Sequence, residues 1–183
     1  MSRTAVIVVD VQQMFFGAEG RAFRGNEVID GINRLTAAAR TANAPVFIVQ
    51  HESDPSGPLA RGSDAWRLPE SLVCEHGDEI IHKSVGDAFE KTPLAARLSQ
   101  WGVDTVVICG YASEFCVNAT ARRAERDGLR TIIVSDLHTT GEKPHLAADK
   151  IVEHQNFVWL HSSMSGNGVK VLPLADLLQT EFA

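Results

Sequence analysis

Residues 105–124 read TVVICGYASEFCVNATARRA, and this stretch predicts a strand that turns sharply into a helix. Residues 105–108 are all β-branched, as in many strands, and Gly110 interrupts the run before an apolar helical pattern begins. Ser113 is expected to cap the helix, which places Cys116 in the first turn, where unpaired N–H groups and the helix dipole favour a thiolate. Cys116 is therefore either a nucleophile or a buried residue that only packs.

Size and composition predict one domain over residues 1–183. The chain has 183 residues, of which 44% are hydrophobic, enough for one well-filled core. Its net charge of -6 argues against nucleic-acid partners and against anionic membrane surfaces. The apolar run near the N-terminus is too short for a signal peptide or a membrane span, so we expect a cytoplasmic protein. Cys74, Cys109 and Cys116 show no CxxC spacing, which fits a reducing compartment better than disulfides or structural zinc.

Strand-like and helix-like segments alternate along the chain. We expect strands at residues 4–9, 46–49, 78–82, 105–108, 131–134, 156–160 and 169–172, and helices at 26–39, 94–101, 114–127, 144–154 and 173–178. The run 4–9 is almost wholly apolar, as a strand buried on both faces of a parallel sheet requires. This alternation predicts βαβ units with helices on both faces of the sheet. The predicted fold class is α/β, with three α/β/α layers.

Chemically useful residues follow the predicted strands. Asp10 leaves the first strand, His51 and Glu52 the second, Lys83 the third, and the turn to Cys116 the fourth. Ligands of parallel sheets bind beyond the carboxyl ends of the strands, so these side chains are expected at one rim. A carboxylate, an ammonium and a thiol there supply a base, an electrostatic partner and a nucleophile. The alternatives are a turn cap, a solvated lysine and a core cysteine.

Three separated segments resemble the isochorismatase-like cysteine hydrolases, a superfamily that includes nicotinamidases and N-carbamoylsarcosine amidohydrolases. They are VIVVDVQQMFF at residues 6–16, IIHKSVGDAFEKTPL at 80–94 and VVICGYASEFCVNATARRAERDG at 106–128. The resemblance implies a six-stranded, mainly parallel, Rossmann-like sheet. It also implies a catalytic triad of Asp10, Lys83 and Cys116.

The resemblance further implies a mechanism. Asp10 takes the thiol proton and later returns it to the leaving amine, while Lys83 holds Asp10 and Cys116 attacks a carbonyl. The backbone N–H groups of Ala112 and Cys116 form the oxyanion hole, and the peptide bond between Tyr111 and Ala112 is cis. A thioester forms and water releases a carboxylic acid.

Differences from relatives narrow the expected substrate. Metal-dependent nicotinamidases carry an Asp-x-His arrangement where this chain has Gln50, His51 and Glu52. We therefore expect no metal and no cofactor, with His51 and Glu52 as the open alternative, and nicotinamide is disfavoured. A cysteine placed as Cys116 favours cleavage of a C–N bond in an amide, ureide or carbamoyl group. A hydrolase of a C–O vinyl ether and a non-catalytic binding protein remain the alternatives.

The segments near the rim suggest the residues that touch the substrate. We expect the pocket to be lined by Gln12, Phe15, His51, Trp66 and Tyr111, which suit a small, largely uncharged amide. Phe16 and Phe115 are expected in the core, and His138 at the surface or at a helix end. The irregular loop 53–72 is predicted to act as a lid or a subunit contact. We expect a homodimer or homotetramer with a small-molecule substrate.

Overall fold

A computed structural model describes residues 3–163, 165–166 and 168–182. Within them the strands are β1 (Thr4–Val9), β2 (Val46–His51), β3 (Glu79–Lys83), β4 (Thr105–Tyr111), β5 (Arg130–Thr139) and β6 (Val169–Leu172). They form one six-stranded sheet in the order β3-β2-β1-β4-β5-β6, and every neighbouring pair is parallel. The predicted α/β class and the six-stranded parallel sheet are confirmed.

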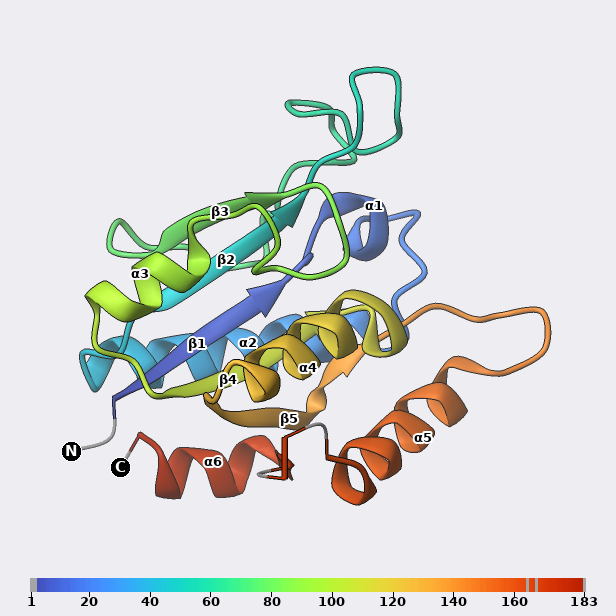
Figure 1. Cartoon of the computed structure of the whole chain (residues 1–183). Helices are drawn as coiled ribbons and strands as arrows, with labels where there is room; N and C mark the ends of the chain where they lie inside the picture. The colour runs from blue at the N-terminus through green and yellow to red at the C-terminus, as the bar shows by residue number, and fades with distance from the viewer. Residues whose placement is uncertain (1–2, 164, 167, 183) are drawn as a thin grey trace.

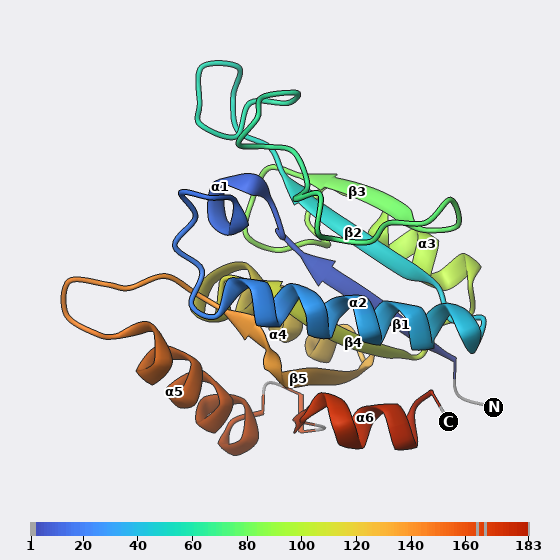
Figure 2. The ribbon, with the colours of Figure 1, turned by 180° about the vertical axis from the view of Figure 1, so that it is seen from behind.

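Helices cover both faces of the sheet. They are α1 (Gln13–Phe16), α2 (Gly25–Thr41), α3 (Leu94–Gln100), α4 (Asn118–Arg126), α5 (Ala148–His161) and α6 (Leu174–Thr180), with a π-helical turn η1 (Ser113–Val117) before α4. Helices α3, α4 and α5 lie on the face turned toward the viewer in Figure 1, and α2 lies on the face seen in Figure 2. Helix α6 packs with α2, so the molecule has three layers.

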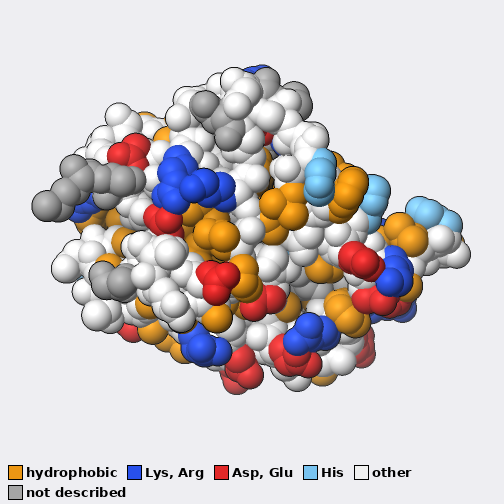
Figure 3. Space-filling view, turned by 90° about the horizontal axis from the view of Figure 1, so that it is seen from below, with side chains coloured by type: hydrophobic (Ala, Val, Ile, Leu, Met, Phe, Trp, Pro, Cys, Tyr) orange, Lys and Arg blue, Asp and Glu red, His pale blue; other side chains and the backbone are white. Residues whose placement is uncertain are grey.

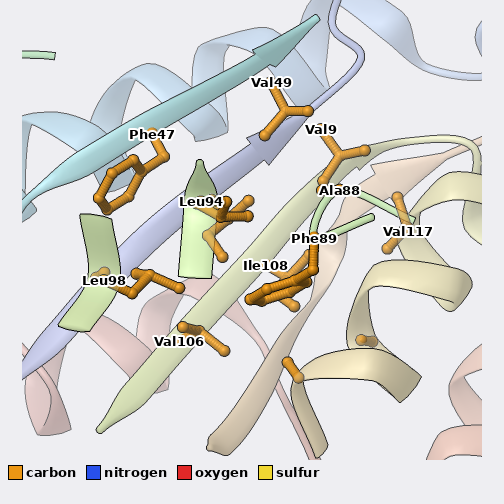
Figure 4. Packing of buried hydrophobic residues seen from close by; sticks show 14 of the residues in the cluster. Val9, Phe47, Val49, Ala88, Phe89, Leu94, Leu98, Val106, Ile108 and Val117 are labelled. Atoms are coloured by element: carbon orange, nitrogen blue, oxygen red, sulfur yellow. The ribbon is translucent and has the colours of Figure 1, made fainter. Parts of the chain in front are cut away.

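Two hydrophobic cores lie between these layers, one on each face of the sheet. Strand residues alternate between them, with Ile7 in the core under α3, α4 and α5, and Val8 in the core under α2 and α6. Figure 4 shows part of the first core, where Leu94 and Leu98 of α3 lie over Phe47 of β2. All six residues of β1 are buried because both faces of this strand are covered.

One predicted strand is wrong, because residues 156–160 belong to α5. Trp159 is fully buried, whereas Phe157 and Leu160 are 58% and 57% exposed. The buried residues of α5 include Ile151, Gln155 and Trp159, which recur every four residues, as one face of a helix does. The short run of large apolar side chains therefore does not indicate a strand here.

The surface carries charges of both signs. On the face shown in Figure 3, acidic and basic side chains lie between hydrophobic ones. The long segment between β2 and β3 projects beyond the sheet at the end where the strand arrows point (Figure 1). Within the described residues, none of the helices combines the length and the apolar character needed to cross a membrane.

Candidate active site

Three chemically complementary side chains meet at the carboxyl end of the sheet. Asp10 follows β1, Lys83 ends β3 and Cys116 lies in η1 after β4. The Lys83 ammonium donates to Asp10 Oδ2 at 2.7 Å and to Cys116 Sγ at 3.3 Å. The side chains of Lys83 and Asp10 are 0% and 3% exposed, so Lys83 is not a solvated surface lysine. The predicted triad residues are therefore in contact.

The ammonium has more acceptors around it than it has protons. Besides Asp10 and Cys116, it lies 3.2 Å from His51 Nδ1 and 3.1 Å from the carbonyl oxygen of Val85. A lysine ammonium only donates, so His51 Nδ1 is an acceptor. Among the described residues, Asp10 Oδ1 is buried and has no hydrogen-bond partner. This oxygen is therefore an unused acceptor on a carboxylate whose charge acts on the Cys116 thiol.

Burial sets the protonation of the site. It raises the pKa of Asp10, an effect that the charge of Lys83 opposes. Burial and the negative charge of Asp10 raise the pKa of the Cys116 thiol to about 12, against the lowering effect of Lys83. Burial and Lys83 lower the pKa of His51, which favours a neutral ring. Burial and Asp10 therefore favour the thiol, whereas the helix turn considered alone favours the thiolate, and a protonated thiol needs a base to react.

Gly110 and a cis peptide bond shape the turn that carries the thiol. Gly110 has a φ of 116°, and a Cβ at this position would lie 2.1 Å from the carbonyl oxygen of Val9 on the neighbouring strand. Only glycine fits there. The next peptide bond but one, between Tyr111 and Ala112, is cis, as the resemblance implied.

The helix cap is not the one expected. Ala112 precedes η1 as the N-cap residue, and no side chain caps the turn. The Ser113 hydroxyl lies 2.8 Å from His138 Nδ1 instead. The side chain of Ser113 thus binds a neighbouring strand, not its own helix.

Four of the predicted pocket residues have ring or hydrogen-bond contacts at this end of the sheet. Phe15 and Tyr111 stack with ring centroids 4.2 Å apart, next to the turn, and His51 touches Lys83. Trp66 stacks on His82 at 5.7 Å, and its buried indole N–H has no partner among the described residues. These residues remain predictions as substrate contacts.

Gln12, also predicted to line the pocket, is bonded to backbone groups of β2 and of the projecting loop. Its side chain is fully buried, and its amide donates to the carbonyl oxygens of His51 and Trp66. Its oxygen accepts the N–H of His51. All of its hydrogen-bonding groups are thus engaged with the backbone, so Gln12 ties β2 to the projecting loop.

Two further side chains differ from expectation. Phe115 is 60% exposed, so its predicted place in the core is wrong, whereas Phe16 is buried as predicted. His138 is 2% exposed, so its predicted surface position is wrong as well. In the sequence, His138 comes shortly after the predicted strand 131–134. This strand extends to Thr139 in β5, so the position of His138 could have indicated that it lies at the same end of the sheet as the triad.

The site contains a donor set that could hold a metal ion. One ligand atom each from Asp10, His51 and Cys116 lie within 4.8 Å of one another. The Lys83 ammonium contacts all three residues, at 2.7 to 3.3 Å, and supplies the positive charge there.

Comparison with known proteins gives consistent matches. The isochorismatase domain family matches residues 4–163. A streptothricin hydrolase from Streptomyces noursei is 36% identical over 142 residues, which cover 76% of this chain and 51% of that protein. A ureidoacrylate amidohydrolase from Methylobacterium radiotolerans is 31% identical, and the match covers 79% of this chain and 71% of that protein.

A solved structure supports the same assignment. The crystal structure of an isochorismatase family protein has a TM-score of 0.82 and 31% identity, with 92% of this chain and 97% of that chain covered. This chain spans about half the length of the streptothricin hydrolase that it matches. The family match includes all three segments around Asp10, Lys83 and Cys116, and the chain therefore belongs to the isochorismatase family.

Proposed function

We propose that this protein is a cysteine hydrolase that cleaves a C–N bond of a small amide, ureide or carbamoyl compound. The observation that carries the proposal is the contact of one buried ammonium, Lys83, with both Asp10 and Cys116. The two relatives named above, a streptothricin hydrolase and a ureidoacrylate amidohydrolase, support this bond type.

In the first step, Cys116 Sγ attacks the carbonyl carbon of the substrate. The raised pKa of the thiol means that its proton must leave during the attack, and the unpartnered Asp10 Oδ1 accepts it. Lys83 holds the other oxygen of Asp10 and keeps the pair charge-balanced. The carbonyl oxygen becomes an oxyanion, which the backbone N–H groups of Ala112 and Cys116 stabilise.

In the second step, the C–N bond breaks. Asp10 gives its proton to the leaving amine, and the acyl group stays on Cys116 as a thioester. Asp10 then takes a proton from water, whose oxygen attacks the thioester carbon. Collapse of this second intermediate releases the carboxylic acid, and the proton on Asp10 returns to the Cys116 sulfur.

The surroundings of the triad support a small, largely neutral substrate. The stacked rings of Phe15 and Tyr111 offer an apolar wall, and His51 has a lowered pKa and is neutral. Such a site suits an uncharged amide better than a charged one. We also propose a homodimer or homotetramer, which light scattering on the purified protein checks.

The test is a screen for released ammonia or amine over small amides, ureides and carbamoylated amines. We expect turnover by the unmodified protein and a loss of at least about 10³-fold in Cys116→Ala, because the nucleophile is gone. Cys74→Ser is the matched control, because Cys74 is exposed and lies near Asp78, which precedes β3, whereas Lys83 ends that strand. A mass increase by the acyl group on the Cys116 peptide identifies the thioester. Full turnover by Cys116→Ala, or cleavage of a vinyl ether alone, contradicts the proposal.

A further inference from the structure

A buried chain of hydrogen bonds runs from the turn that carries the nucleophile to helix α5. Ser113 Oγ lies 2.8 Å from His138 Nδ1, and His138 Nε2 lies 2.9 Å from Asn156 Oδ1. We infer that His138 is a positioning residue, which acts through Ser113 to hold the turn carrying Cys116. This inference rests on the proposed function.

The direction of each hydrogen bond follows from one fixed acceptor. The Asn156 amide nitrogen donates to the carbonyl oxygen of Ser135 at 3.1 Å, so Asn156 Oδ1 faces His138 and accepts. His138 Nε2 must then carry the proton, which leaves Nδ1 as an acceptor. The Ser113 hydroxyl therefore donates to His138 Nδ1.

The surroundings keep this arrangement neutral and rigid. Ser113 is fully buried, and His138 is 2% exposed with its ring edge against Trp159 at a centroid distance of 5.0 Å. Burial lowers the pKa of His138 to about 4, so the ring carries one proton at neutral pH. The hydrogen bond to Asn156 and the charges of Asp136 and Glu114 oppose this lowering of the pKa without cancelling it. The neutral ring keeps Nδ1 as an acceptor for Ser113 at pH values well above about 4.

The position of Ser113 gives this link its consequence. Ser113 lies in the turn between Ala112 and Cys116, whose N–H groups are the proposed oxyanion donors. No side chain caps η1, whose N-cap residue is Ala112, and the Ser113 hydroxyl binds His138. Loss of the bond would let both donors and the sulfur shift together. A misplacement of about 1 Å can lower a rate by about 10²-fold.

The first test is kinetic, on an amide that the unmodified protein hydrolyses. In Ser113→Ala and in His138→Leu we expect kcat to fall about 10- to 100-fold, while KM changes less than about threefold. The double variant falls no further, because both changes remove the same bond. His138→Asn places an amide oxygen near the position of Nδ1 and restores most of kcat.

Several kinetic outcomes would overturn the inference. The first is a kcat of Ser113→Ala within about twofold of that of the unmodified protein. The second is a double variant whose loss of kcat is the product of the two single losses. The third is a His138→Asn variant with a kcat as low as that of His138→Leu. Thermal denaturation accompanies each assay. A loss of kcat that only follows the loss of folded protein counts against positioning, and the small change Ser113→Ala guards against misfolding of His138→Leu.

A second measurement needs no substrate. Nitrogen NMR of histidine-labelled protein should detect the imidazole of His138, identified by the loss of its signals in His138→Leu. It should be protonated only at Nε2, as His51 is, and only its own Nδ1 signal should shift in Ser113→Ala. Protonation of His138 at Nδ1 near neutral pH would overturn the inference. Failure of every amide in the screen would contradict the proposed function and leave this NMR result standing, so the two failures are distinguishable.

Discussion

Lys83 Nζ and Asp10 Oδ2 form an ion pair of 2.7 Å in which the two side chains are 0% and 3% exposed. Neither charge contacts solvent, so each depends on the other for its stability. Such pairs contribute little net stability compared with apolar residues, but the loss of one partner is costly. An effect on the reactivity of the neighbouring thiol therefore explains this buried pair better than a contribution to the stability of the fold does.

The first prediction concerns Lys83→Met. This change leaves the Asp10 carboxylate buried without its cation, and we expect a loss of about 3–5 kcal/mol in the free energy of unfolding near neutral pH. The pKa of Asp10, already raised by burial, rises further without Lys83. A carboxyl whose pKa is raised in the folded state loses stability as pH rises, so the loss is larger at about pH 8 than at about pH 5. Urea denaturation at both values measures it.

The double variant Asp10→Asn with Lys83→Met provides the control for this prediction. It removes both charges, so part of the lost free energy should return and its dependence on pH should flatten. A single variant Lys83→Met as stable as the unmodified protein at both pH values would show that the pair is not isolated from solvent.

The second prediction concerns the pH dependence of turnover. Asp10 must be ionised to accept the thiol proton, and its pKa is raised from the ordinary value of 3.8 by burial. We therefore expect the acid-side fall of kcat/KM to lie at a higher pH than the ordinary pKa of an aspartate would give. The thiol pKa of about 12 predicts no thiolate absorbance in the ultraviolet between about pH 6 and 9. A thiolate signal in that range, absent in Cys116→Ala, would refute this protonation scheme.

Much of the fold follows from local patterns. The apolar run at residues 4–9 predicts a strand buried on both faces, and the β-branched run at 105–108 predicts a second strand. Both strands lie in the middle of the sheet. A parallel sheet gathers the carboxyl ends of its strands at one edge. For this reason Asp10, Lys83 and Cys116 could be placed together although they are far apart in the sequence.

Features that depend on distant partners could not be predicted. The Ser113 hydroxyl binds His138, 25 residues further along the chain, and local rules assigned it to its own helix. The protonation of Cys116 depends on burial and on Asp10, which outweigh the helix turn that the sequence shows. The engagement of Gln12 with backbone groups likewise requires the three-dimensional path of a loop.

The third prediction concerns Gly110→Ala. A Cβ here would meet the carbonyl oxygen of Val9 at 2.1 Å, and the φ of 116° strains any side chain, so we expect a loss of more than about 3 kcal/mol in stability. Gly128→Ala is the matched control. Gly128 has a φ of 89° with no atom within 4 Å of the added Cβ, so its cost should be about 1 kcal/mol. Equal losses in chemical denaturation would argue against close contact between β1 and β4 at Val9.

The fourth prediction concerns Gln12→Leu. The change leaves the N–H of His51 and its carbonyl oxygen without their buried partner, at a cost of about 3 kcal/mol in the free energy of unfolding. The carbonyl oxygen of Trp66 accepts hydrogen bonds from the side-chain amides of Gln12 and Gln50. The change removes the first of these bonds and leaves the second. We expect faster trypsin cleavage in the projecting loop, which contains Arg61. Gln179→Leu, at an exposed helix position, should change neither quantity. A rise in KM with unchanged stability and cleavage would instead support the predicted contact of Gln12 with the substrate.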